Sequence, residues 1–147
     1  MTRSTMRAGL VFCLWSIASA CGAADTITLT LNGHTLTAEV ADQPDERVRG
    51  LMYRDSLGSE AGMLFVYTDD AERRFWMKDT RIPLSIAYLD AGCRIVKIAD
   101  LQPLNETGVP SGRPARYALE VNQGWFAKNG VTEGSVVEGV KDATKKP

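Results

Sequence analysis

The chain has 147 residues, of which 44% are hydrophobic and 24% charged, with 17 basic side chains against 18 acidic ones. This length suits one folded domain and is short for two. A net charge of −1 leaves no excess of basic side chains for a phosphate backbone, so we expect no nucleic-acid partner.

Residues 1–24 have the pattern of an export signal followed by a short leader. Two arginines give a basic start, and residues 8–19 form an apolar run that is too short to anchor the chain across a bilayer. Cleavage before Cys21, at a sequence that resembles the lipobox of bacterial lipoproteins, would leave this cysteine for acylation. Cleavage after Ala24 would instead release a soluble protein. We therefore predict an exported protein, either periplasmic or anchored to the cell envelope through lipid on Cys21.

The remaining chain is predicted to form one β-rich domain over residues 25–140 and a polar tail over residues 141–147. Alternating apolar residues predict two strands, over residues 26–31 and 34–40. The dipeptide Asn32-Gly33 between them favours the positive φ angles of a tight turn, so these strands are predicted to form a hairpin.

A helix is predicted to begin after Asp42, because Pro44 and the acidic residues beside it are typical of a first helical turn. Val48, Leu51 and Met52 then share one helical face, which we expect to be buried.

Short apolar runs predict further strands over residues 62–67, 74–80, 84–89, 94–101, 117–121 and 135–140. Glycines and prolines predict a loop over residues 105–116, and Asn122 is expected to cap a short helix that ends at Gly130. Seven or eight short strands with two short helices predict a mainly β fold, a single small antiparallel β-barrel or β-sandwich.

Large apolar side chains and charges meet in the five consecutive residues Phe75, Trp76, Met77, Lys78 and Asp79. On a strand, each face of this segment would carry both an apolar and a charged group. Such a strand is typical of the wall of a pocket. The alternative is an edge strand in which Trp76 lies beneath the aliphatic stem of Lys78.

Glu120 lies among strand-forming residues, where an unpaired carboxylate would be costly. It must therefore be paired, solvated or protonated. Arg49, Lys78 and Arg116 are the candidate partners for a salt bridge, which is one interpretation of this residue. The other interpretation is a polar anchor at the base of a cleft.

We predict a binding domain rather than an enzyme, with a cleft for a sugar, another small polar ligand or a component of the cell envelope. The residues expected to line this cleft are Arg49, Trp76, Met77, Lys78, Glu120 and Trp125. We expect a monomer without a cofactor or metal, since His34 is the only histidine and a zinc site of the ordinary type would need more ligands.

Two other functions remain open. Asp79 and Glu120 could form the acid–base pair of a hydrolase that acts on envelope carbohydrate. Met52, Met63 and Met77 could instead hold Cu(I), because thioether ligands favour this ion.

Four motifs of the sequence occur in the order and spacing of a known family. They are RGLMYR over residues 49–54, GMLF over 62–65, FWMKDTRIPLSI over 75–86 and YALEVNQGWF over 117–126. With the NG and EGSVV that follow, they resemble the bacterial and archaeal family called domain of unknown function 192, over residues 29–140. The resemblance implies a single small, mostly β domain that is often exported, and it implies no reaction.

The family pattern falls on Arg49, Gly50, Leu51, Met52, Arg54, Gly62, Met63, Phe65, Phe75, Trp76, Met77, Lys78, Thr80, Pro83, Leu84, Leu119, Glu120, Gly124 and Trp125. The chain departs from it at two positions. Asp79 stands where the family usually has Asn, and Ser85 stands where it often has Asp. The second departure removes a carboxylate, which weakens the case for an acid catalyst at that position.

Overall fold

The computed structural model describes residues 24–144, so the predicted export signal and Cys21 lie outside the described residues. The described elements are β1 (Thr26–Leu31), β2 (His34–Ala41), α1 (Pro44–Arg49), β3 (Ala61–Phe75), β4 (Leu84–Leu89), β5 (Ile95–Leu101), β6 (Val109–Asn122), α2 (Trp125–Lys128), β7 (Val137–Glu138) and the 3-10 helix η1 (Val140–Thr144). Among these residues, no helix combines the length and the apolar character needed to cross a bilayer.

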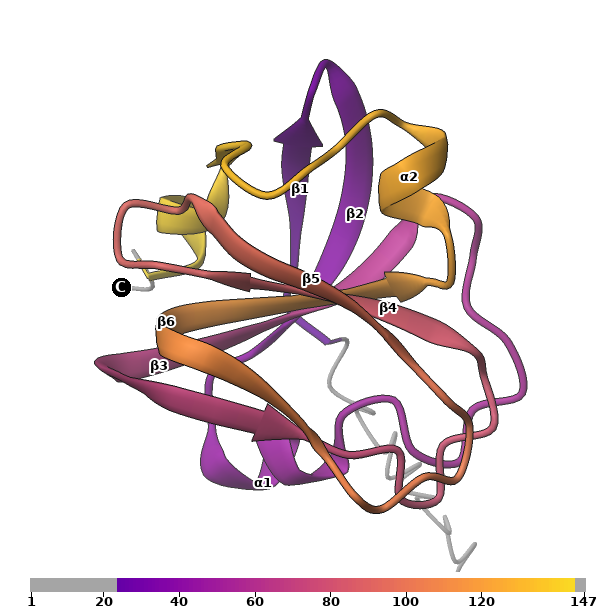
Figure 1. Cartoon of the computed structure of the whole chain (residues 1–147). Helices are drawn as coiled ribbons and strands as arrows, with labels where there is room; N and C mark the ends of the chain where they lie inside the picture. Colours follow the sequence, from indigo (N-terminus) through magenta and orange to yellow (C-terminus); the bar gives the residue numbers. More distant parts are fainter. Residues whose placement is uncertain (1–23, 145–147) are drawn as a thin grey trace, which may run out of the picture.

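All seven strands belong to one mixed sheet with the order β5-β4-β6-β3-β2-β1-β7. The predicted hairpin of β1 and β2 is confirmed, with Leu29 opposite Leu36. The sheet curls into a half-barrel (Figure 1). The mainly β class and the two short helices are therefore confirmed, whereas the predicted antiparallel β-barrel or β-sandwich is wrong, because the sheet is mixed and forms a half-barrel.

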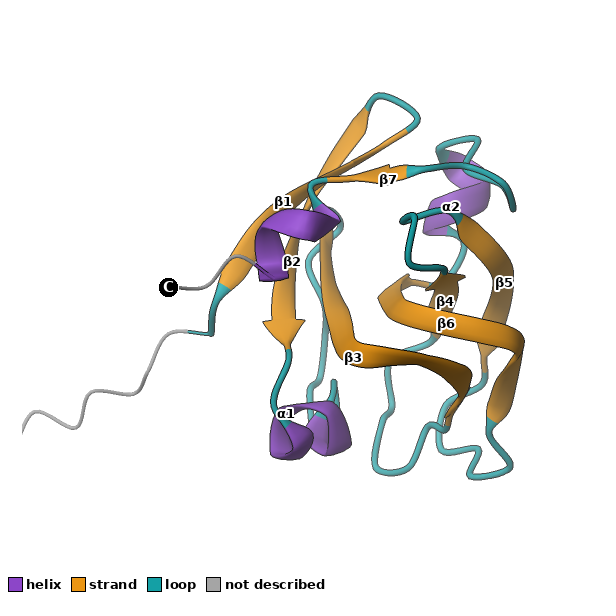
Figure 2. Cartoon of the chain, turned by 90° about the vertical axis from the view of Figure 1, so that its left-hand side faces the viewer, coloured by secondary structure: helices purple, strands orange, loops and turns teal. Residues whose placement is uncertain are grey.

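The strands β2 and β3 cause this difference, because they run parallel to each other. Parallel neighbours need a crossover connection, and α1 with the segment up to residue 60 supplies it. Figure 2 shows α1 at the end of β2, below the sheet. The connection returns the chain to the end of the sheet at which β2 began, so that β3 can run in the same direction as β2. The helix α1 lies next to β3.

Backbone hydrogen bonds tie the two ends of the sheet together at one point. Arg94 forms an isolated bridge with Val136. The N–H of Ile95 donates to the carbonyl oxygen of Ser135 at 2.9 Å, and the N–H of Val137 donates to that of Cys93 at 2.9 Å. The segments that precede β5 and β7 thus meet and cover one end of the interior.

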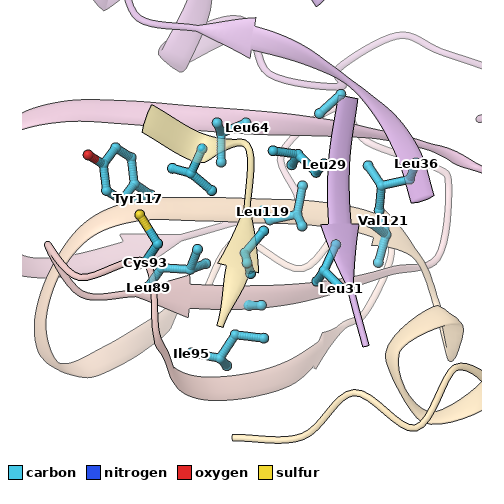
Figure 3. Close-up of a cluster of buried hydrophobic side chains, with 14 of the residues drawn as sticks. Leu29, Leu31, Leu36, Leu64, Leu89, Cys93, Ile95, Tyr117, Leu119 and Val121 are labelled. Carbon is cyan, nitrogen blue, oxygen red and sulfur yellow. The ribbon is translucent and has the colours of Figure 1, made fainter. Parts of the chain in front are cut away.

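Leucines from neighbouring strands fill one face of the sheet. Leu29, Leu36, Leu64 and Leu119 come from β1, β2, β3 and β6, and all are buried in one cluster (Figure 3). Phe126 of α2 and Val140 of η1 belong to the same cluster. The helices α2 and η1 therefore cover this face, and all of η1 except Val140 lies in the segment for which the sequence predicted a polar tail.

A second cluster lies on the opposite face, which we call the aromatic face because three of its rings contact one another. The rings of Phe65 and Phe75 meet edge to face with their centroids 4.7 Å apart, and Tyr88 contacts Phe75 in the same way at 5.8 Å. Side chains alternate between the faces along a strand. On β6, Leu119 therefore joins the first cluster, while Glu120 points to the aromatic face.

Two predicted element boundaries are wrong in the centre of the chain. β3 ends at Phe75, so residues 76–80 form a turn instead of a strand. β6 begins at Val109, inside the predicted loop. Its prolines, such as Pro110 and Pro114, pair with β3 where the register shifts, and such irregular pairing tolerates residues that lack an N–H.

Two details of the predicted helices also differ. Val48 is 69% exposed because α1 ends at Arg49, before a buried helical face could form. Gly124, rather than Asn122, precedes α2 as its cap residue. The side-chain amide of Asn122 instead donates to the carbonyl oxygens of Leu57 and Gly58, at 3.1 and 2.9 Å.

We predict that Gly139→Ala destabilises the fold more than Gly134→Ala. Both glycines have φ near +90°, which costs an alanine about 1–2 kcal/mol. A Cβ at residue 139 would also lie 2.4 Å from the carbonyl oxygen of Thr28, whereas at residue 134 nothing lies within 4 Å. Urea unfolding should give Gly139→Ala an additional loss of about 1–3 kcal/mol. Equal losses would contradict the close approach to β1.

Candidate functional site

A small cavity lies between α1, the turn after it and the aromatic face of the sheet. Its volume is about 30 Å³. It is lined by residues 47–52, by Phe65 and Phe75 of β3, by Trp76 and Thr80 of the following turn, and by Glu120 of β6. A water needs about 10–15 Å³ of such space. The cavity therefore has room for one or two waters, or for one functional group of a larger ligand.

Glu120 forms the polar part of the cavity and comes from the middle of the sheet. β6 lies between β3 and β4, and Glu120 pairs with Met63 on one side and Ile86 on the other. Its side chain is only 4% exposed. None of the candidate partners pairs with it: Arg116 binds Asp70 at 2.7 Å instead. The salt bridge considered from the sequence is thus absent from the described residues.

The carboxyl oxygens of Glu120 reach the cavity. Among the described residues, every fully enclosed side-chain oxygen or nitrogen has a hydrogen-bond partner. No described residue forms a hydrogen bond or an ion pair with the Glu120 carboxyl, so its oxygens cannot be fully enclosed. Of the cavities described among residues 24–144, this is the one that Glu120 lines. Water or a ligand group there is what can satisfy the carboxyl.

Burial raises the pKa of Glu120 from 4.5 to about 8. The cause is loss of solvation of the charged form, since no positive side chain offsets it. At neutral pH the group is therefore mostly an uncharged carboxylic acid. In this form it donates one hydrogen bond and accepts others.

Two arginines from α1 line the same cavity, and they differ in their contacts. The guanidinium of Arg47 donates to the carbonyl oxygens of Asp42 and Val66, and its Cζ lies 5.0 Å from the centre of the Tyr67 ring. Arg49 is exposed, and no described carboxylate pairs with it. Arg47 is therefore held in the structure, whereas Arg49 is available to a ligand.

Residues 48–53 and 76–80 lie beside the cavity, and residues 104–105 are bonded to the second of these segments; we call the three segments the rim. Hydrogen bonds join them. The N–H and the hydroxyl of Tyr53 donate to the backbone oxygen and the carboxylate of Asp79, at 2.9 and 2.8 Å. The N–H of Leu104 donates to the carbonyl oxygen of Thr80 at 3.0 Å. Figures 1 and 2 both show these loops at the end of the molecule where α1 lies.

The backbone of the rim adopts an uncommon conformation at three side-chain-bearing residues. Tyr53, Asp79 and Leu104 have φ of 62°, 51° and 62°. A left-handed conformation costs roughly 1–2 kcal/mol for such residues and is easiest for Asn and Asp. This accounts for Asp79 at a position where the resembling family has Asn. For Tyr53 and Leu104 the same conformation holds large apolar side chains in solvent.

Trp76 lies at the entrance of the cavity. It is 47% exposed, and the Nζ of Lys78 lies 5.5 Å from the centre of its ring. No described carboxylate forms an ion pair with Lys78. On its other side, Trp76 lines a second cavity of about 20 Å³ together with the buried Met77.

The structure thus unites Arg49, Trp76 and Glu120 at one cavity and places Lys78 over the indole. Met77 lies behind Trp76, in the hydrophobic layer. Trp125 is not part of this site, because α2 packs on the opposite face of the sheet. The indole N–H of Trp125 donates to Glu60 at 3.0 Å. A cleft walled by both tryptophans is therefore not present.

The residues of the alternative functions also do not gather at the cavity. Asp79 is bonded to Tyr53 and does not line it. Of the three methionines considered for Cu(I), only Met52 lines the cavity. Within residues 24–144, no group of three or more His, Cys, Asp or Glu side chains could hold a metal ion.

Ser85, the second departure from the family pattern, has a structural role. Its hydroxyl donates to Asp100 at 2.6 Å and accepts the N–H of Gly124 at 3.0 Å. Ser85 and Asp100 are opposite each other on β4 and β5. A carboxylate is therefore supplied by the neighbouring strand, and the pair holds the turn that leads into α2.

The sequence reasoning missed several residues of the cavity, namely Arg47, Val48, Phe65, Phe75 and Thr80. Three of them, Phe65, Phe75 and Thr80, belong to the family pattern. The signal that could have found them is the convergence of separate motifs: residues from RGLM, GMLF, FWMKDT and YALEV all meet around one carboxyl group.

Comparison with known proteins gives a family and a fold. The sequence model of DUF192, described as an uncharacterised ACR family, matches residues 27–139. No curated protein matches the chain.

Solved structures that are similar to the chain include proteins of Sinorhizobium meliloti and Novosphingobium aromaticivorans. A protein of Sinorhizobium meliloti, provisionally described as a transcription regulator, is 32% identical with a TM-score of 0.77; the match covers 80% of this chain and 95% of that one. A protein of unknown function from Novosphingobium aromaticivorans is 33% identical with a TM-score of 0.76; the match covers 80% and 88% of the two chains.

We predict that Glu120 makes the stability of the protein fall as pH rises. The folded state keeps the proton up to about pH 8, whereas the unfolded chain releases it near 4.5. Between these values the folded state holds more protons, so the free energy of unfolding decreases with pH. For this group alone, the loss between pH 5 and pH 8 is about 3 kcal/mol.

Urea unfolding of the wild type and of Glu120→Gln at both pH values tests this prediction. The amide has the shape of the protonated acid and does not titrate. The variant should therefore lose about 3 kcal/mol less than the wild type over this range. The same pH dependence in both proteins would show that Glu120 is ionised or solvated in the folded state.

Proposed function

The chain belongs to the DUF192 family, and we propose that it is a binding domain whose cavity receives one polar group of a small hydroxylated ligand, such as a sugar. The observation that carries this proposal is the carboxyl group of Glu120. It is nearly fully buried, has no partner among the described residues and reaches a cavity that opens beside a half-exposed tryptophan. No reaction is part of the proposal.

The size of the cavity limits what can enter it. A volume of about 30 Å³ excludes a sugar ring, since binding sites for whole small molecules typically measure about 300–1,000 Å³. One hydroxyl or hydroxymethyl group can enter. The remainder of the ligand would then lie over the rim, against Trp76.

The chemistry of the cavity favours a hydroxyl group. An uncharged carboxylic acid donates and accepts hydrogen bonds, and so does a hydroxyl. A hydroxyl therefore satisfies Glu120 without the cost of burying a charge. The exposed part of the Trp76 indole offers an apolar face beside this point, and a flat ring with both apolar and polar edges is suited to a partner of mixed polarity.

We predict that Trp76→Ala strongly weakens binding while it leaves the fold intact. Half of this side chain is exposed, so its removal opens little of the core. Calorimetric titration with a panel of neutral methyl glycosides should show an affinity at least about tenfold lower in the variant. Val136→Ala is the control, because Val136 is 43% exposed and does not line the cavity.

Two results would contradict the proposal. Equal affinity of Trp76→Ala and wild type would place the ligand elsewhere. If the wild type binds no glycoside at millimolar concentration, a sugar is excluded as the ligand. A variant that fails to fold would show that Trp76 belongs to the core, and Glu120→Leu would then test the same cavity from its floor.

We further propose that the protein is exported, on the pattern of residues 1–24. Expression of the full chain with an export pathway should give a mature protein that begins at Cys21 or after Ala24. The denatured mass distinguishes these products, because acylation of Cys21 adds the mass of its lipid. A mass that includes residues 1–20 would contradict export.

A further inference from the structure

We propose that the ligand is an acidic sugar, with one hydroxyl in the Glu120 cavity and its carboxylate held at the rim by Arg49 and Lys78. This inference rests on the proposed function and narrows the class of ligand. It adds an anionic group at a defined place, outside the cavity and beside Trp76.

The first support is the set of cations around Trp76. Arg49 lines the cavity with Trp76, and the Nζ of Lys78 lies 5.5 Å from the centre of the indole ring. Both side chains are exposed, and neither forms an ion pair with a described carboxylate. An anion placed beside the indole would therefore meet two cations without displacing an existing partner.

The second support is that these cations stand apart from the ion pairs of the fold. Those pairs are Arg54–Glu39, Arg73–Asp69 and Arg116–Asp70. The carboxylate closest to Lys78 in the sequence, Asp79, accepts the hydroxyl of Tyr53 at 2.8 Å. Arg49 and Lys78 are thus left to solvent, although the fold pairs other arginines.

The third support is the chemistry of Glu120, the polar residue of the cavity. Glu120 is an uncharged acid at neutral pH, because burial raises its pKa. It therefore does not repel an anionic ligand, and it can still bind a hydroxyl of that ligand. A cationic ligand is the less favourable alternative, because Arg47 and Arg49 line the cavity as well.

Methyl glucuronide and methyl glucoside provide a matched pair of ligands, since they differ only in a carboxylate in place of a hydroxymethyl group. Corresponding galactose and mannose pairs extend the test to other ring stereochemistries. At low ionic strength we expect the wild type to bind the acid of the preferred pair about tenfold more tightly than its neutral partner. The preference should shrink with added salt, because exposed charges are screened.

The double variant Arg49→Ala with Lys78→Ala should lose this preference. Its affinity for the acid should fall about tenfold more than its affinity for the neutral partner, so that the ratio of the two affinities falls close to one. Lys128→Ala is the control: this exposed cation lies on α2, away from the cavity. It should change neither affinity.

The outcomes separate this inference from the proposed function. If the neutral glycosides bind as tightly as the acids, or if the double variant keeps the preference, the acidic ligand is wrong while the binding domain stands. If no glycoside of any pair binds the wild type, both are wrong. One result supports the inference: the wild type prefers the acid, and the double variant does not.

Discussion

The buried carboxyl group of Glu120 is the constraint on which the aromatic face of this protein depends. It lies on the interior strand β6, between β3 and β4, and has no partner among the described side chains. A core residue chosen for stability alone would be apolar, because an unsatisfied polar group in such a layer is costly. The surrounding structure does not remove this cost by a salt bridge. It leaves a cavity beside the carboxyl instead. This arrangement is expected where water or a ligand satisfies the polar group.

The two faces of the sheet consequently have different characters. The face filled by leucines is covered by α2 and η1 and is closed at one end by the bonds between residues 93–95 and 135–137. The aromatic face is bordered by α1 and by loops whose backbone is held in left-handed conformations at Tyr53, Asp79 and Leu104. Such conformations persist where the surrounding structure fixes them, and they are common at binding sites. Here the bonds between the three rim segments fix them.

Local sequence patterns predicted the features that depend on local structure. The alternation and the Asn32-Gly33 turn predicted the first hairpin, and a carboxylate among strand-forming residues identified Glu120 as a residue that needs an explanation. The lack of a partner for Glu120 was not predictable, because it depends on the register of β3 and β6, which sets Arg116 beside Asp70. Trp125 was assigned to the site for a similar reason: its sequence does not tell which face of the sheet α2 covers. The sequence of residues 76–80 has the pattern of a strand, but the segment is a turn. The hydrogen bonds that bend it come from Tyr53 and Asn105, which are distant in the sequence.

The pairing of β3 with β6 also has a consequence for how the protein acquires its fold. Gly62 pairs with Val121, so the central ladder closes a loop of about 60 residues. The entropy of closing such a loop must be overcome before the long-range contacts form, and folds with this topology are correspondingly slow. The first hairpin can form early, but β2 and β3 remain an open parallel edge until β6 has been synthesised. The sheet is thus incomplete, and the cavity lacks its carboxyl group, until the last third of the chain is present.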